Sequence, residues 1–292
     1  MPARPSPVVW TAAARALRET WPGVVTGEAA AVHRARVATR RLREALAVLD
    51  VKRRSVRRLR RDLRSLTGAL GPVRELDVTL GLIVRLLHDE PDLEGALETM
   101  RVQLMQKRAR RRARLLHYID EVDIAGLLAR IRAIDAEARA SLATRQPTVS
   151  ADVVRRRIGD RTGRVEAAIG RAGALYAPEP LHEVRIALKK LRYALELGRV
   201  ARLPHAARQA GHLRRYQDLL GEWHDWQVLS SHAVRAQSGV SIGDGRLAEF
   251  TTLSARVEDR CRALHAEFMA GRDELAARLS EIAALAGAAR HS

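Results

Sequence analysis

Hydrophobic residues recur every three or four positions along almost the whole chain, and no stretch alternates apolar and polar residues as a half-buried strand would. Leu, Ala, Arg and Glu, which all favour helices, dominate the composition. Breaks rich in Pro and Gly separate the periodic segments, the first of them at Trp21-Pro22-Gly23. The pattern predicts an all-α protein with helices at about residues 7–20, 28–49, 55–89, 92–119, 121–145, 150–175, 180–202, 204–237 and 245–286.

Two segments of the chain occur twice. HRARVATRRLREAL, residues 33–46, resembles HEVRIALKKLRYAL, residues 182–195. Further along, LGPVRELDV at residues 70–78 matches LGEWHDWQV at residues 220–228. Because both matches keep the same order and an offset of about 150 residues, they predict an internal duplication.

The duplication predicts two structural halves related by a pseudo-two-fold axis. The length of 292 residues and the hydrophobic content of 47% allow two cores of ordinary domain size. We expect each half to be a bundle of about four helices, with residues 121–149 as the connection. The first bundle is placed at residues 5–145 and the second at residues 146–286.

The repeated helix has a hydrophobic face and a basic face. At about 100° per residue, Ala38, Leu42, Ala45, Leu46 and Leu49 gather on one side of the first copy. The opposite side carries His33, Arg36, Arg40 and Arg43 in the first copy and His182, Arg185, Lys189 and Arg192 in the second. Amphipathicity alone explains a charged face, but solvated faces usually mix acids with bases. In both copies, basic residues instead neighbour basic residues on this face, which favours a ligand-facing role for the stripe.

Other predicted helices also carry basic stripes. One stripe holds Lys107, Arg110, Arg111 and Arg114, and the helix after the first repeated motif holds Arg57, Arg58, Arg60, Arg61 and Arg64. The corresponding helix of the second half holds Arg208, His212, Arg214 and Arg215. Because Arg58 matches Arg208 and Arg64 matches Arg214, these positions join the candidate binding residues.

The net charge of the chain points to an anionic partner. At +18, with a pI near 11.3, the surface attracts polyanions and otherwise costs self-repulsion. Four of the 52 basic residues are lysines and the rest are arginines, whose planar fork can hold a phosphate through two hydrogen bonds.

The sequence predicts a protein of a reducing compartment. Its one cysteine, Cys261, excludes an intramolecular disulfide. No segment offers the roughly 20 apolar residues of a membrane span, and the first residues contain no continuous apolar signal region. We therefore expect a cytoplasmic protein without stable membrane insertion.

The repeated motifs resemble those of the CHAD domain, the conserved histidine α-helical domain. The shared pattern is His-x-x-Arg followed by a basic cluster, and then Leu-Gly-x-x-x-Asp/Glu-x-x-Val, twice in an all-helical chain. The resemblance covers about residues 5–286. It implies two four-helix bundles that face each other across a basic groove, which binds inorganic polyphosphate without catalysis. Association with polyphosphate granules follows as an expectation. Because the triphosphate-processing CYTH domain of many members is not found here, we expect a stand-alone form.

The resemblance assigns the phosphate contacts residue by residue. They fall on Arg36, Arg40, Arg41 and Arg43 in the first copy, and on Arg185, Lys189, Lys190 and Arg192 in the second. His33 and His182 match the histidines that give the domain its name. At the second motif, Arg74 stands where His224 stands and Asp77 where Gln227 stands, so we place no ligand contacts in that segment.

Neither histidine has the local His or Cys partner that a metal site usually shows, so we expect no metal and no cofactor. A phosphate-binding role and a structural role stay open for both. The His224-Asp225 dipeptide is interpreted as structural, since a two-metal phosphohydrolase centre needs further ligands. With no phosphate-binding loop and no activated nucleophile motif, the sequence does not indicate an enzyme.

The alternative function is binding of nucleic acid through its phosphate backbone. Aromatic residues make up 3% of the chain, which leaves little for stacking on unpaired bases. A duplex bound through its phosphates alone is still compatible with the sequence. Inorganic polyphosphate is the preferred partner because it needs aligned cations and no base recognition.

Overall fold

The computed structural model describes residues 8–46, 53–144, 151–241 and 244–287. Within these ranges the chain is all-α, as predicted, with ten α-helices and one short 3-10 helix. The helices are α1 (Val8–Thr26), α2 (Ala29–Ala45), α3 (Arg53–Asp89), α4 (Glu94–Glu121), α5 (Ile124–Thr144), α6 (Ala151–Arg171), α7 (Pro178–Val200), α8 (Ala206–Gln237), α9 (Arg246–Ala270) and α10 (Arg272–Gly287), with η1 (Pro91–Leu93) before α4.

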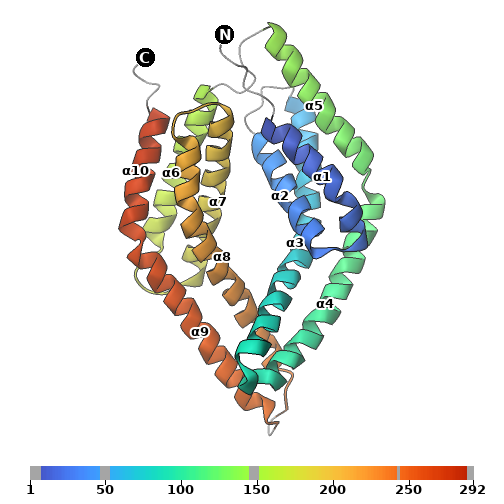
Figure 1. Cartoon of the computed structure of the whole chain (residues 1–292), viewed down its shortest axis with the longest axis vertical. Coiled ribbons are helices and arrows are strands. Elements are labelled where there is room, and N and C mark those ends of the chain that lie inside the picture. The colour runs from blue at the N-terminus through green and yellow to red at the C-terminus, as the bar shows by residue number, and fades with distance from the viewer. Residues whose placement is uncertain (1–7, 47–52, 145–150, 242–243, 288–292) are drawn as a thin grey trace.

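The helices form two groups that meet at one end of the molecule (Figure 1). One group contains α1, α2, α5 and the start of α3, and the other contains α6, α7, α10 and the start of α8. The far ends of the long helices α3 and α8 meet α4 and α9 in a junction at the narrow end. Each long helix is therefore part of both its own bundle and the junction.

The two halves use the same neighbour relations. Successive helices pack in the order α1–α2–α3–α4 in the first half and α6–α7–α8–α9 in the second. Helix α5 packs on α1 and α3, as α10 packs on α6 and α8. Each half thus has five helices among the described residues, and the segment 121–149, expected as a connection, contains α5. Leu127, Ile131 and Ile134 bury one face of α5, which explains the difference.

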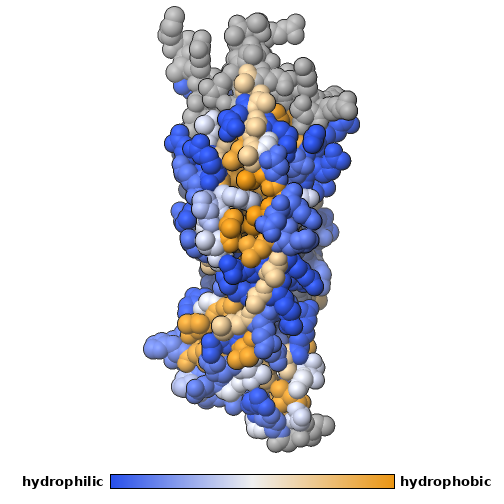
Figure 2. All heavy atoms as spheres, turned by 90° about the vertical axis from the view of Figure 1, so that its right-hand side faces the viewer, coloured by the Kyte–Doolittle hydropathy of each residue, from blue (hydrophilic) through white to orange (hydrophobic). Residues whose placement is uncertain are grey.

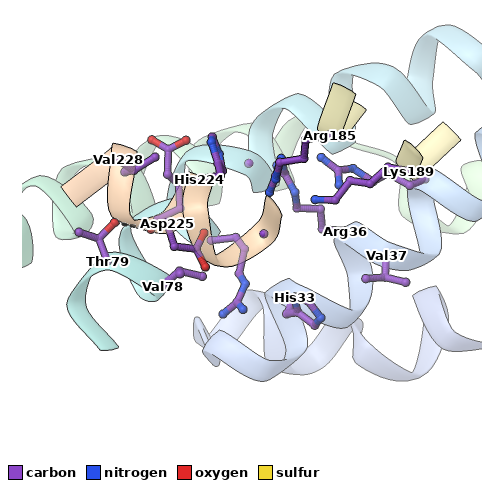
Figure 3. Close-up of a pocket in the computed structure, with 15 residues that line it drawn as sticks. His33, Arg36, Val37, Val78, Thr79, Arg185, Lys189, His224, Asp225 and Val228 are labelled. Atoms are coloured by element: carbon purple, nitrogen blue, oxygen red, sulfur yellow. Dashed lines mark hydrogen bonds between the residues drawn. The ribbon is translucent and has the colours of Figure 1, made fainter. Parts of the chain in front are cut away.

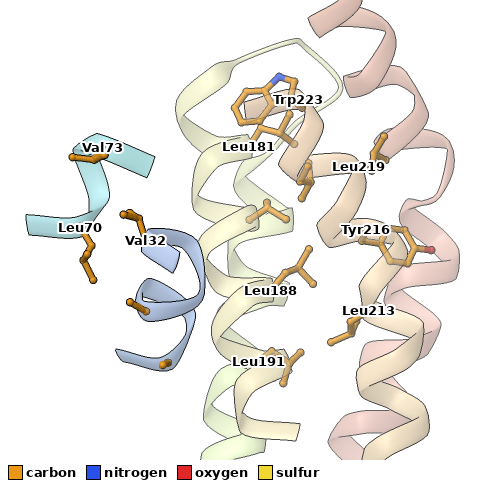
Figure 4. Close-up of a cluster of buried hydrophobic side chains, with 14 of the residues drawn as sticks. Val32, Leu70, Val73, Leu181, Leu188, Leu191, Leu213, Tyr216, Leu219 and Trp223 are labelled. Atoms are coloured by element: carbon orange, nitrogen blue, oxygen red, sulfur yellow. The ribbon is translucent and has the colours of Figure 1, made fainter. Parts of the chain in front are cut away.

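The leucine face predicted for the repeated helix lies in the core. Leu42 and Leu46 in the first copy and Leu191 and Leu195 in the second are fully buried; the predicted Leu49 lies outside the described residues. Figure 4 shows Leu181, Leu188 and Leu191 of α7 beside Leu213 and Trp223 of α8, with Val32 of α2 near Leu70 and Val73 of α3. Burial of each such side chain contributes about 1.5–3 kcal/mol, so this face holds the bundles together.

Two predicted helix boundaries are wrong. Helix α1 continues through Pro22 to Thr26, since Pro22 is exposed and buried Val24 keeps the next turn in the core. The helix stops at Gly27, whose φ of +83° suits glycine. The predicted helix 245–286 is divided at Gly271 into α9 and α10, and the hydroxyl of Tyr216 donates a hydrogen bond to the Gly271 carbonyl at 3.1 Å.

The outer face over α1, α4 and α5 is mostly hydrophilic, with narrow hydrophobic areas between the polar side chains (Figure 2). Across the described part of the chain, no helix combines the length and the apolar character that crossing a membrane requires.

Candidate functional site

A cavity of about 280 Å³ lies between the two halves. The repeated helices α2 and α7 and the Leu-Gly segments of α3 and α8 line it (Figure 3). Its lining residues are His33, Arg36, Val37, Arg40, Gly71, Arg74, Glu75, Val78, Thr79, Arg185, Lys189, Gly221, His224, Asp225 and Val228. The structure therefore brings the two copies of both motifs together, although they lie far apart in the sequence. We call this space the central cavity.

The central cavity has more cations than anions. Five basic side chains and two carboxylates line it. Burial, followed by the charges of Arg185 and Arg40, lowers the pKa of Lys189 to about 7. Burial, followed by the charge of Arg40, lowers the pKa of Arg36 to about 10. Like charges that are held close together and partly shielded from water repel each other, which raises the free energy of the empty site. A bound anion would reduce this repulsion.

Arg185 offers a hydrogen-bond donor without a partner. Its Nε atom is buried, and no acceptor among the described residues forms a hydrogen bond with it. Burial lowers the pKa of Arg185, while the charge of Asp225 opposes that change. An unsatisfied buried donor costs about 1–3 kcal/mol, and an oxygen of an anionic ligand could remove that cost.

The Leu-Gly motif makes room for an arginine in the first half. A Cβ atom on Gly71 would lie 2.3 Å from Nη1 of Arg36, so the guanidinium lies directly over the glycine. The corresponding Gly221 has open space beside it and lines the cavity. Glycine at position 71 thus sets how deeply Arg36 can sit against α3.

The histidines of the site are held in their neutral form. The rings of His182 and His224 lie 5.2 Å apart, centroid to centroid. Burial, followed by the charge of Arg185, lowers the pKa of His224 to about 3. Burial also lowers the pKa of His33 and of His182. His33 and His224 line the cavity, whereas His182 is not in its lining and lies next to the His224 ring. Within the described ranges, no group of three His, Cys, Asp or Glu side chains is arranged to hold a metal ion.

Four of the phosphate contacts implied by the family resemblance do not line the cavity. Arg41 of α2 and Arg192 of α7 both contact Glu196, at 3.5 and 3.4 Å. Arg43 is half-buried, and its closest charged neighbours include Arg64 and Glu44. Lys190 lines a different hollow, between α6 and α7, where burial and then the charge of Arg161 lower its pKa. Two of these residues are therefore bound to the carboxylate of Glu196 in this structure.

The basic residues of α8 do not reach the central cavity. Arg215 contacts Glu274 of α10 at 3.4 Å, and Arg214 contacts Asp218 on its own helix at 3.6 Å. Arg208 acts on the pKa of Glu281, also on α10. Arg208 and Arg215 lie toward α10 and Arg214 pairs within α8, so a contact of these three arginines with the same ligand stays a prediction.

The remaining predicted residues lie on α3 and α4. Arg58 and Arg64 are exposed, and Arg64 is close enough to Arg43 to lower its pKa. After burial, the pKa of Lys107 is lowered by Arg235 and Arg111, and Glu75 of the cavity opposes this. Lys107 and Arg111 thus extend the cationic surface from the cavity toward α8. Arg114 is exposed and does not line the cavity.

The Leu-Gly segments contain cavity residues that sequence reasoning left out, namely Arg74, Glu75, His224 and Asp225. The shared offset of the two segments was the signal that could have found them. Burial raises the pKa of Asp225, and four basic neighbours led by Arg185 oppose this. The carboxylates therefore lie among the motif cations, as expected for groups that hold arginines in place.

Asp77 and Gln227 occupy the same position in the two segments. The difference between these two residues follows from their contacts outside the cavity. Asp77 accepts a hydrogen bond from Nε of Arg108 on α4 at 2.5 Å. Its counterpart Gln227 donates to the hydroxyl of Tyr176, which precedes α7. Each side chain anchors its long helix to a different neighbour.

Comparisons with known proteins agree with this arrangement. No curated protein matches the chain. Among solved structures, PptA from Streptomyces chartreusis has a TM-score of 0.69 and 18% identity, covering 90% of this chain and 96% of that one. The CHAD domain from the plant Ricinus communis has a TM-score of 0.59 and 21% identity, covering 97% of this chain and 91% of that one. These two likenesses show the fold. The family model of the CHAD domain matches residues 9–234. The chain therefore belongs to the CHAD-domain family.

Proposed function

We propose that this protein binds inorganic polyphosphate, without catalysis, in the central cavity between its two halves. The observation that carries the proposal is the convergence of Arg36 and Arg40 with Arg185 and Lys189 in one space. Membership in the CHAD-domain family supports a polyphosphate-related role. Attachment to polyphosphate granules would follow from such binding, and fluorescence microscopy of a tagged protein tests it.

The form of the cavity favours a thin, flexible polyanion. Basic side chains approach from α2 and α3 on one side and from α7 on the other, so they can surround successive phosphates. Duplex DNA is too wide for a space of about 280 Å³ and would touch only its rim. Among the described residues no Phe, Tyr or Trp lines the cavity, so these residues offer bases no aromatic stacking surface there.

A competition titration tests the choice of ligand. Long-chain polyphosphate should displace labelled duplex DNA or single-stranded RNA when all are supplied at equal phosphate concentration and fixed ionic strength. Both kinds of complex weaken with salt because both release counterions, so only the ratio at one salt concentration is decisive. A ratio near one, or tighter binding of duplex DNA, would replace this proposal with the nucleic-acid alternative.

Stability and turnover provide two further measurements. A ligand that binds only the folded state stabilises it by about 2.7 kcal/mol at 100 times its Kd, so Tm should rise with polyphosphate. Free phosphate should not accumulate during long incubation. An unchanged Tm at saturation would contradict binding across both halves, and steady phosphate release would contradict the absence of catalysis.

A further inference from the structure

A second hollow lies on the second half, away from the central cavity. Its volume is about 320 Å³, and it lies between α6 and α7, which pack side by side (Figure 1). Its lining residues are Arg161, Arg164, Ala167, Ala168, Arg171, Glu183, Ile186, Ala187 and Lys190. We call it the α6–α7 hollow.

The α6–α7 hollow is rich in cations with few counterions. Arg171 is bound by Glu183, whose carboxylate oxygen it contacts at 2.7 Å. Burial, followed by the charge of Arg157, lowers the pKa of Arg161, and burial followed by Arg161 lowers that of Lys190. Arg164 is exposed at the same site.

The nearby carboxylate of Glu44, on α2, is shared. Arg157 contacts it at 2.5 Å and Arg161 at 3.7 Å. One carboxylate therefore faces several basic groups, and Arg161 is the more distant of its two partners. A phosphate group placed here would meet Arg161, Arg164 and Lys190 without first displacing the pair formed by Arg171.

Cations connect the hollow with the central cavity. Arg40 lines the cavity and is close enough to lower the pKa of Arg43. Arg43 in turn lowers the pKa of Lys190, which lines the hollow. Glu44, which follows Arg43 on α2, contacts Arg161 of the hollow at 3.7 Å, so the basic residues at this end of α2 lie next to the hollow.

The first half contains a matching hollow with a different lining. Between α1 and α2, a space of about 500 Å³ uses Arg34, Val37, Ala38 and Arg41 where the second half uses Glu183, Ile186, Ala187 and Lys190. Helix α1 contributes three alanines to it and no basic residue, and Arg41 is bound to Glu196. The α1–α2 hollow is therefore the equivalent of the α6–α7 hollow in the first half, but α1 has no arginine in it where α6 has Arg161, Arg164 and Arg171.

We propose that the α6–α7 hollow is a second phosphate subsite, which takes the part of a long polyphosphate chain that extends beyond the central cavity. This proposal rests on the proposed function. Two connected subsites on one ligand raise the affinity for a chain long enough to reach both, and leave the affinity for a short chain unchanged. The polyanion therefore runs toward the second half rather than symmetrically.

The test compares the double variant R161E/R164E with the control R34E/R199E, which reverses two exposed arginines lining the α1–α2 hollow. Affinity for long-chain polyphosphate should fall at least about tenfold in R161E/R164E, while affinity for tripolyphosphate stays within about twofold. The control should lose no more than about threefold for the long chain, through the general loss of positive charge. Equal losses in both variants, or an equal loss for tripolyphosphate, would overturn the subsite.

Folding and the proposed function are tested separately. Because Arg161 is largely covered and contacts Glu44, R164E alone serves as the variant that changes only an exposed residue. Its long-chain affinity should fall about threefold or more, with an unchanged Tm. If the wild-type protein binds long-chain polyphosphate and both variants bind it equally well, the subsite is wrong and the central cavity stands. If the wild type does not bind it, both proposals fall.

Discussion

The two Leu-Gly segments occupy equivalent places in the two halves, and their side chains are anchored differently. In α3, Asp77 is bound by Arg108 of α4, which also donates to the Gly27 carbonyl at 3.4 Å. In α8, Gln227 joins the Tyr176 hydroxyl, which Trp223 contacts as well at 3.4 Å. The first half thus fixes its segment through an ion pair and the second through neutral hydrogen bonds.

The side chains that face the cavity show which charges the two halves share. The repeated cations of α2 and α7 are kept in both halves, whereas Arg74 of α3 is replaced by the neutral His224 in α8. Arg36 covers Gly71, and Gly221 stays open. The comparison indicates that the cavity-facing cations of α2 and α7 are the constant part of the repeat, while the residues of α3 and α8 differ between the halves.

The largest effect is expected from reversing one shared cation in each half. R40E/K189E should weaken polyphosphate binding by about 100-fold, since each residue supplies a charge-assisted contact worth about 1.5–3 kcal/mol. The control R18E/R132E reverses two exposed arginines on α1 and α5. Isothermal titration at fixed salt measures both. Equal losses in the two variants would mean that a diffuse surface field, not the repeated stripe, binds the ligand.

The anchors themselves should differ in strength. The Asp77 side chain is 5% exposed and Arg108 is 27% exposed, so D77A leaves a largely buried guanidinium unpaired and should cost about 2–3 kcal/mol of unfolding free energy. Q227A removes a neutral hydrogen bond and should cost about 1 kcal/mol. Urea unfolding of both variants checks this. If Q227A is the more damaging of the two, the ion pair is not the stronger anchor.

Lys189 should make binding depend on pH. In the empty protein its pKa is about 7, and a bound polyanion favours the charged form, so the complex takes up a proton above pH 7. Affinity should be greatest near or below pH 7 and should fall by up to about tenfold per pH unit above it. K189R, which stays protonated, should flatten the profile. If the affinity of the wild-type protein did not change with pH, the lowered pKa of Lys189 would be contradicted.

The smallest effects should come from the two motif glycines. G221A adds a methyl group in open space and should stabilise α8 by about 0.5–1 kcal/mol through helix propensity, without displacing a basic side chain. G71A should push the Arg36 guanidinium away from α3, gain less stability and weaken polyphosphate binding by about threefold. Thermal unfolding and titration of the pair decide the matter. Identical behaviour would remove the proposed role of Gly71.

Periodicity predicted the helices and the basic stripes, whereas the convergence of the two stripes on one groove was implied by the resemblance to the CHAD domain. Leu42 and Leu191 mark the buried face, and the basic stripe opposite each of them must then face outward or toward a partner. The repetition of the stripe in two copies favoured a ligand-facing role for it. The structure places both stripes on one cavity.

The sequence could not show which carboxylate each arginine would contact. Arg215 lies on the correct helix, but its direction toward Glu274 depends on the position of α10. Likewise, the contact of Arg41 with Glu196 depends on how α2 approaches α7. Residues 121–145 were predicted as a helix within the connection, and the sequence did not show that this helix would pack on α1 and α3. Helix packing, rather than local pattern, decides these features.

The long helices α3 and α8 also make the cavity sensitive to events far from it. At 37 residues, α3 is about 55 Å long, and one helix therefore belongs both to the cavity wall and to the junction with α4 and α9. The cavity residues of α3, from Gly71 to Thr79, lie about 15–27 Å from its end at Asp89, so a tilt of about 5° at the junction would move them by about 1–2 Å. The aperture offered to a polyanion is therefore set partly by how the helices pack at the junction.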